Sequence, residues 1–121
     1  MSKRFRFGPV ALTTTLTTNL LNPPAASGGV NAGSSGQYIV LNHIRVVNKT
    51  SGTETFSLWL GATGANAAGT EVVGQLYPVP GKDAVDWYGA LRLDVGDFLV
   101  GGASANTALT ITGEGEVGVA G

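Results

Sequence analysis

The feature that most constrains the fold is a succession of short apolar runs in which every second residue is apolar. The clearest run, residues 55–60, places Phe56, Leu58 and Leu60 on one face. No stretch of the chain shows the period of about 3.6 residues that marks an amphipathic helix. Roughly seven or eight short strands, separated by turns at intervals of about 8–12 residues, are typical of a β-sandwich or a jelly roll. The sequence therefore predicts an all-β chain with a single β-sandwich or jelly-roll-like body.

The expected body begins with a long central strand at residues 38–47, which has a bulge near Asn42. A turn at residues 48–52 leads into the strand at residues 55–60, so we expect these two strands to form a hairpin. The remaining strands are expected at residues 76–80 (a proline-limited edge segment), 84–93, 98–100 and 108–112, with a final edge strand at residues 114–121.

The first 36 residues differ in composition from the rest of the chain. They open with the basic-aromatic run Lys3-Arg4-Phe5-Arg6-Phe7, continue with an alternating strand at residues 10–21, and end in a Pro-, Gly- and Ser-rich loop at residues 22–36. We therefore expect an extended N-terminal arm and linker at residues 1–36 and a β-sandwich body at residues 37–121. The strand of the arm is expected to pair with the body or with a neighbouring subunit.

The charge content indicates that part of the surface is covered by other subunits. Charged residues make up only 12% of the chain, whereas hydrophobic residues make up an ordinary 43%. A soluble monomer normally has about twice this share of charged residues, near 25%. Three of the seven basic residues lie in the first six positions, which leaves four basic and eight acidic residues in the rest. A cationic arm of this kind is suited to an acidic neighbour.

The residues for catalysis and metal binding are mostly missing. The chain has no cysteine and one histidine, His43, which we expect to be a packing residue within a strand. A catalytic triad or a zinc site needs further His, Cys or acidic partners. The acidic pairs Asp83/Asp86, Asp94/Asp97 and Glu114/Glu116 are expected to serve turns and the surface. The sequence therefore predicts that the chain is not an enzyme and holds no metal or cofactor.

Membrane and nucleic-acid partners are not expected either. No apolar run approaches the length of about 20 residues that a membrane span needs. The three basic residues of the N-terminal run are few for phosphate binding. Threonines interrupt the N-terminal apolar pattern, which makes a signal peptide a poor interpretation.

Exposed aromatic residues are the best candidates for partner binding. Trp59 faces away from Phe56 and Leu58 in a regular strand, and the adjacent Trp87 and Tyr88 must face opposite sides. Outward-facing aromatic residues are enriched at interfaces, although a sandwich that covers both faces would bury them. The predicted partner-binding residues are Lys3, Arg4, Phe5, Arg6, Phe7, Trp59, Trp87 and Tyr88.

Several segments resemble small all-β structural proteins of tailed bacteriophages. They are the I-x-V-x-N strand at residues 44–48, the L-x-L-G-x-x-G run at residues 58–64, the W-Y-G-x-L-x-L strand at residues 87–93, the D-x-G-D-x-L turn at residues 94–99 and the L-T-I strand at residues 109–111. The motifs are structural, so the resemblance implies no catalytic residue.

The resemblance implies a virion protein, most directly a capsid decoration (cement) protein that stabilises capsomer junctions. The implied partners are the major capsid protein, other virion proteins and further copies of the chain, with a homotrimer favoured. The arm would add a strand to the sheet edge of a neighbour. The implied location is the virion, assembled in the bacterial cytoplasm. The alternatives are a low-copy collar, head-fibre or tail component, and a carbohydrate- or host-surface-binding module that uses Trp59, Trp87 and Tyr88.

Overall fold

The computed structural model describes residues 3–23, 37–62, 64, 66–73, 75–94 and 96–119. These residues form strands and turns, with no helix among them. The strands are β1 (Lys3–Ala11), β2 (Thr18–Leu21), β3 (Gln37–Asn48), β4 (Glu54–Gly61), β5 (Tyr77–Val79), β6 (Ala84–Leu93), β7 (Phe98–Ala103) and β8 (Leu109–Val119). Within those ranges, no helix has the length and apolar character that a membrane span requires.

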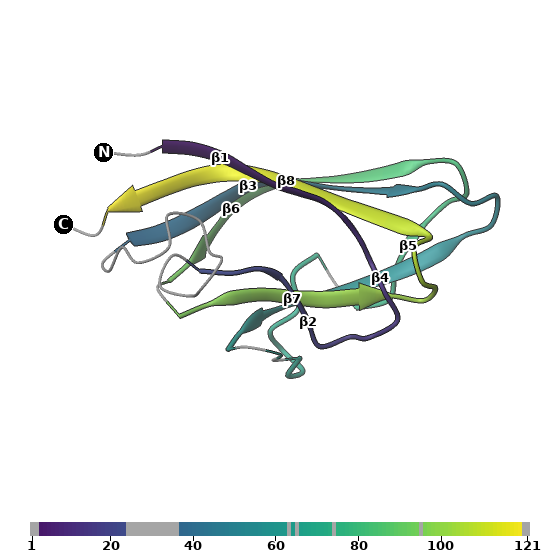
Figure 1. The fold of residues 1–121 in the computed structure, drawn as a ribbon, viewed down its shortest axis with the longest axis horizontal. Coiled ribbons are helices and arrows are strands. Elements are labelled where there is room, and N and C mark those ends of the chain that lie inside the picture. Colours follow the sequence, from purple (N-terminus) through teal and green to yellow (C-terminus); the bar gives the residue numbers. More distant parts are fainter. Residues whose placement is uncertain are drawn as a thin grey trace.

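Two four-stranded antiparallel sheets pack face to face as a β-sandwich (Figure 1). Sheet A has the strand order β1-β8-β3-β6, and sheet B has the order β2-β7-β4-β5. This arrangement confirms the predicted all-β sandwich. The expected strand at residues 84–93 coincides with β6, and the proline-limited segment forms β5 at the edge of sheet B, as predicted.

The core lies between the sheets and is built from the alternating apolar residues. Phe56 and Leu58 of β4 face inward, as their spacing predicts. The largest fully buried side chains come from both sheets and from the segment after β1: Leu12, Ile39, Leu41, Ile44, Val46, Phe56, Leu58, Val79, Leu93, Leu99, Leu109 and Ile111. Burying one such side chain stabilises a fold by about 1.5–3 kcal/mol, so this set is the main source of stability.

The predicted hairpin between the first two body strands is wrong. β3 pairs with β6 and β8 in sheet A, whereas β4 pairs with β5 and β7 in sheet B. The turn between them carries the chain from one sheet to the other and is fixed by the buried Asn48. Its amide nitrogen donates to the carbonyls of Gly52 (2.8 Å) and Val79 (3.0 Å). Alternation shows which face of a strand is buried, but it does not show which strand is the neighbour.

The N-terminal segment is part of the sandwich, which differs from the expected separate arm. β1 pairs with β8, β2 pairs with β7, and Phe7, Leu12 and Leu21 belong to the core. The single strand expected at residues 10–21 is interrupted after Ala11, because there the chain crosses from sheet A to sheet B (Figure 1). The pairing of β1 and β2 with the body is one of the two outcomes expected for this segment, and the domain boundary at residue 36 stays a prediction. Most of the expected linker, residues 24–36, lies outside the described residues.

The C-terminal strands also differ from expectation. The strand predicted at residues 108–112 and the described part of the edge strand predicted at residues 114–121 form one strand, β8, which lies between β1 and β3 at the interior of sheet A. Gly113, which lies between the two expected strands, leaves room for the ring of Phe7 on the opposite strand.

The predicted bulge at Asn42 is confirmed. The pairing of β3 with β8 shifts by one residue between Leu41 and His43, where Asn42 is the extra residue. The pairing of β3 with β6 shifts at the same point, and there Gly89 and Ala90 of β6 lie opposite Asn42. The amide of Asn42 donates to the carbonyl of Gly89 at 3.4 Å. The bulge therefore fixes how the outward-facing side chains of β3 and β6 align.

Candidate interaction surface

The outward face of sheet B is largely covered by the chain itself. Ser57 is 1% exposed and Trp59 3% exposed, although both face away from the core residues of β4. Two crossing segments bond to this face: the backbone of Leu76 donates to the Ser57 hydroxyl (2.9 Å), and the backbone of Ala103 donates to the Thr13 carbonyl (2.8 Å). A hollow of about 270 Å³ remains between these segments, bordered by Leu16 and Leu76.

The outward face of sheet A carries charged and aromatic side chains in rows across the four strands. The antiparallel register aligns Arg4, Glu116, Val40 and Arg92 in one row, Arg6, Glu114, His43 and Tyr88 in the next, Thr112, Arg45 and Asp86 in a third, and Thr110, Val47 and Ala84 in a fourth. We call these residues, together with Tyr38, the open face. Tyr88 is 71% exposed and Val47 is 40% exposed, so this is the more accessible of the two sheet faces.

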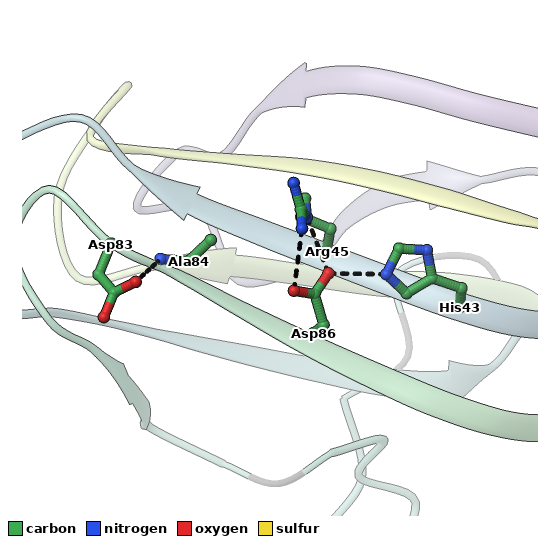
Figure 2. Close-up of polar contacts among 5 residues, drawn as sticks. All are labelled: His43, Arg45, Asp83, Ala84 and Asp86. Carbon is green, nitrogen blue, oxygen red and sulfur yellow. Dashed lines mark hydrogen bonds and ion pairs between the residues drawn. The ribbon is translucent and has the colours of Figure 1, made fainter.

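A charged cluster of His43, Arg45 and Asp86 occupies the centre of the open face (Figure 2). Arg45 makes a two-point contact with the Asp86 carboxylate, with distances of 2.8 Å from Nε to Oδ1 and 3.1 Å from Nη2 to Oδ2. His43 Nε2 lies 2.7 Å from the same Oδ1. The cluster forms because His43 and Arg45 are two residues apart on β3 and Asp86 is paired with Arg45 on β6. Paired guanidinium and carboxylate groups of this geometry hold each other in fixed orientations.

The cluster is electrostatically suited to recognition. The hydrogen bonds from Arg45 and then from His43 lower the pKa of Asp86 to about 2. The hydrogen bond to Asp86 in turn raises the pKa of Arg45. A carboxylate with so low a pKa is a poor proton acceptor near neutral pH, because an effective general base has a pKa near the working pH. The cluster therefore presents fixed charges and does not favour acid–base chemistry by Asp86.

Aromatic rings flank the cluster on the same face. The rings of His43 and Tyr88 stack with 4.6 Å between centroids and 7° between planes. The Arg92 guanidinium lies 4.0 Å above the Tyr38 ring, and its Nε donates to Asp94 at 2.7 Å. A hollow of about 140 Å³ lies beside the Tyr38 ring. Because a stacked tyrosine loses little conformational freedom on binding, Tyr88 has the character of an interface anchor.

The structure divides the predicted partner-binding residues between the surface and the interior. Tyr88, Arg4 and Arg6 are exposed on the open face. Phe5, Phe7 and Trp87 instead pack against the core, and Trp59 is buried on the other sheet. Phe7 and Trp59 are buried, because β1 alternates inward and outward and because sheet B is covered, whereas Phe5 and Trp87 are only partly buried. The partner-binding role of these four residues stays a prediction. The side chain of Lys3 lies outside the described part of the chain.

Sequence reasoning missed the central cluster. It treated His43 as a packing residue and Asp86 as one of several surface carboxylates, and it assigned no role to Arg45. The signal that was present is the two-residue spacing of His43 and Arg45 in one alternating strand and of Asp86 and Tyr88 in another. Bringing the two pairs together requires the β3–β6 register, which depends on the bulge at Asn42.

Comparisons of the chain with protein-family models, curated proteins and solved structures gave no match.

Proposed function

We propose that the chain is a structural protein of a tailed-bacteriophage virion, most directly a capsid decoration protein, and that it acts by binding other protein subunits. The observation that carries this proposal is the pairing of the strands. β1 pairs with β8, β2 with β7, β3 with β6 and β4 with β5, which is the pairing of one long hairpin rolled into two sheets. This nesting supports assigning the sandwich as a jelly roll. Jelly rolls are common in viral capsid domains, so the step from fold to role is an analogy.

The open face supports a binding role for the chain. It presents the exposed Tyr88 and the charges of Arg45 and Asp86, which are paired with each other across β3 and β6. Aromatic and arginine side chains are enriched where protein surfaces meet. The low charge content, 12%, also suits a surface that contacts other subunits over a wide area.

The geometry gives less support to the carbohydrate- or host-surface-binding alternative than to the binding of protein subunits. That hypothesis used Trp59, Trp87 and Tyr88 as stacking platforms. Trp59 is only 3% exposed and Trp87 is partly buried against the core, so of the three only Tyr88, which is 71% exposed, is presented to solvent as a largely exposed ring.

Quantitative mass spectrometry of purified particles tests the proposal. The sample is the phage that encodes this chain, and the measurement is the number of copies of the chain per major capsid subunit. A fixed stoichiometric ratio supports a decoration protein, and a few copies per particle indicates a collar, head-fibre or tail component. Absence of the chain from particles contradicts the virion role.

A binding assay tests the surface. Particles that lack the chain are incubated with purified wild type or with the Tyr88→Ala variant, and bound protein is quantified after sedimentation. We expect Tyr88→Ala to reduce binding at least about tenfold, as for an anchoring residue. Leu76→Ala is the matched control, because Leu76 is 63% exposed but lies on the sheet-B side. Equal binding by both variants would place the contact elsewhere.

A further inference from the structure

We propose that the free edge of β6 pairs antiparallel with β6 of a second copy of this chain, which joins the two A sheets into one continuous sheet. The inference stands apart from the virion role, because it concerns the purified chain alone.

The first argument is that β6 is a long edge strand with less protection against pairing than the other three edges. Among the described residues, only β3 pairs with β6, so its other side presents unpaired backbone groups along ten residues. Natural proteins protect such edges with proline, lysine, bulges or very short strands. The other three edges are protected in this way: β1 contains Lys3 and Pro9, β5 has three residues and contains Pro78, and β2 has four residues. β6, with ten residues, is the longest of the four edge strands and contains neither proline nor lysine. Its one irregularity among these devices is the bulge at Gly89 and Ala90.

The second argument is that apolar side chains along β6 are incompletely buried. Val85, Trp87 and Leu91 pack against the core but remain partly exposed. They lie at the side of the sandwich where β6 has no neighbour. A strand added at this edge would cover them, and removal of apolar surface from water is the main favourable term in association.

The third argument is that one register brings complementary side chains together. When Gly89 lies opposite Gly89 of the second copy, Asp86 lies opposite Arg92, and Trp87 lies opposite Leu91, each twice by symmetry. The charges then meet on the open face and the apolar pair meets on the inner face. Gly89 suits the axis because it has no side chain, and a Cβ there would approach the Trp87 ring to 2.8 Å.

Other registers fit less well. A shift by one residue places inward apolar residues opposite outward polar ones. A shift by two residues in one direction places Asp86 opposite Asp94 of the second copy, a like-charge pair, which is unfavourable. A shift by two residues in the other direction places Asp86 opposite Ala90 and separates it from Arg92. The partner that best matches the free edge of β6 is therefore β6 of a second copy of the chain.

Disulfide trapping tests the register directly, because the chain has no native cysteine. Two single variants, Tyr88→Cys and Ala90→Cys, are mixed and oxidised at low concentration, since the proposed register places residue 88 opposite residue 90. Paired residues in antiparallel strands have Cα atoms about 4.5–5.5 Å apart, within the range of disulfides. We expect a disulfide-linked heterodimer in the mixture. Mixed Arg4→Cys and Arg6→Cys variants are the matched control at β1, the other free edge of sheet A, and should stay monomeric.

Sedimentation equilibrium provides an independent readout without new cysteines. We expect reversible dimers of the full chain, with a dissociation constant that Arg92→Glu raises about tenfold or more, because the new carboxylate opposes Asp86 twice. Arg6→Glu makes the same charge change on β1 and should leave the dissociation constant unchanged. Circular dichroism confirms that both variants are folded. The proposal would be overturned if the wild-type chain stays monomeric or forms trimers. It would also be overturned if Arg6→Glu, and not Arg92→Glu, weakens the dimer, or if the Arg4→Cys and Arg6→Cys pair is trapped as readily as the Tyr88→Cys and Ala90→Cys pair.

Discussion

The ring of Phe7 on β1 occupies the space that a side chain would fill at Gly113, the residue directly opposite it on β8. This contact fixes the first strand of the chain to the last one. It also explains why β8 contains a glycine in the interior of a sheet, where glycine is otherwise unfavourable.

Substitution at this contact tests the packing of β1. A Cβ at Gly113 would collide with the Phe7 ring, so we expect Gly113→Ala to lower the free energy of unfolding by about 1–3 kcal/mol. Urea denaturation measures the effect, and the double variant with Phe7→Leu should recover part of the loss. Gly52→Ala is the control, because a Cβ there meets nothing within 4 Å. If the two alanine variants are equally stable, β1 does not pack as described.

The N-terminal segment should be required for folding. Leu12 is fully buried, so Leu12→Ala should cost about 2–5 kcal/mol of stability, as much as Leu58→Ala in the middle of the sandwich. The exposed Leu16, only four residues further on, should tolerate the same change with little effect. Thermal and urea unfolding of the three variants give the comparison. A folded, fully stable chain after deletion of residues 1–23 would restore the idea of a separate arm.

The turn from sheet A to sheet B should depend on the amide of Asn48. Asn48 is 1% exposed and donates to two backbone carbonyls. Asn48→Ala leaves those carbonyls without their donor, and the expected loss is about 1–3 kcal/mol. Asn106→Ala removes an acceptor for the backbone of Thr14 at an exposed site and should cost less. Equal losses would mean that the turn is held by other contacts.

The stability of the fold should fall in acid partly because Asp86 becomes protonated. The pKa of Asp86 in the folded chain is about 2, below the value of about 3.9 for an unfolded aspartate. A lowered pKa in the folded state stabilises the chain above about pH 4, and this contribution disappears as the pH falls toward 2. The urea midpoints of wild type and Asp86→Asn should therefore differ most near neutral pH and converge toward pH 2.

A second set of variants, made in a chain that already carries Arg45→Gln, distinguishes the Arg45–Asp86 pair from the general effect of acid on the stability of the fold. The largest cause of the lowered pKa is the hydrogen bond from Arg45. In an Arg45→Gln background, Asp86→Asn should therefore have a smaller effect at neutral pH than in the wild-type background. Identical effects in the two backgrounds would show that the pair is not coupled.

The sequence predicted the parts of the fold that depend on local pattern. The spacing of Phe56 and Leu58 identified an inward face, the prolines near Tyr77 identified an edge, and the polar residue at Asn42 identified a bulge. These features follow from strand geometry and from the lack of a backbone N–H donor in proline. Both effects act within a few residues.

The parts that failed depend on contacts between distant residues. Nothing near Trp59 shows that distant segments of the chain cover its face, and nothing near Arg45 shows that Asp86 will lie opposite it. The basic-aromatic run is predicted to belong to an extended N-terminal arm, because its partner strand, β8, lies more than 100 residues away in the sequence. Pairing is decided by the burial of whole faces, which is a property of the complete sheet.

The interior position of β8 has a consequence for biosynthesis. Because β8 separates β1 from β3, sheet A cannot assemble until Leu109–Val119 has left the ribosome. Until then β1 has no neighbour in its sheet, and its apolar residues Phe5 and Phe7 have no core to enter. Contacts of such high sequence separation slow folding and prolong the lifetime of incomplete chains with exposed strand edges. Sheet A should therefore be completed only after β8 has emerged, and the yield of the chain in the cell should respond to chaperones more strongly than that of a protein built from local hairpins.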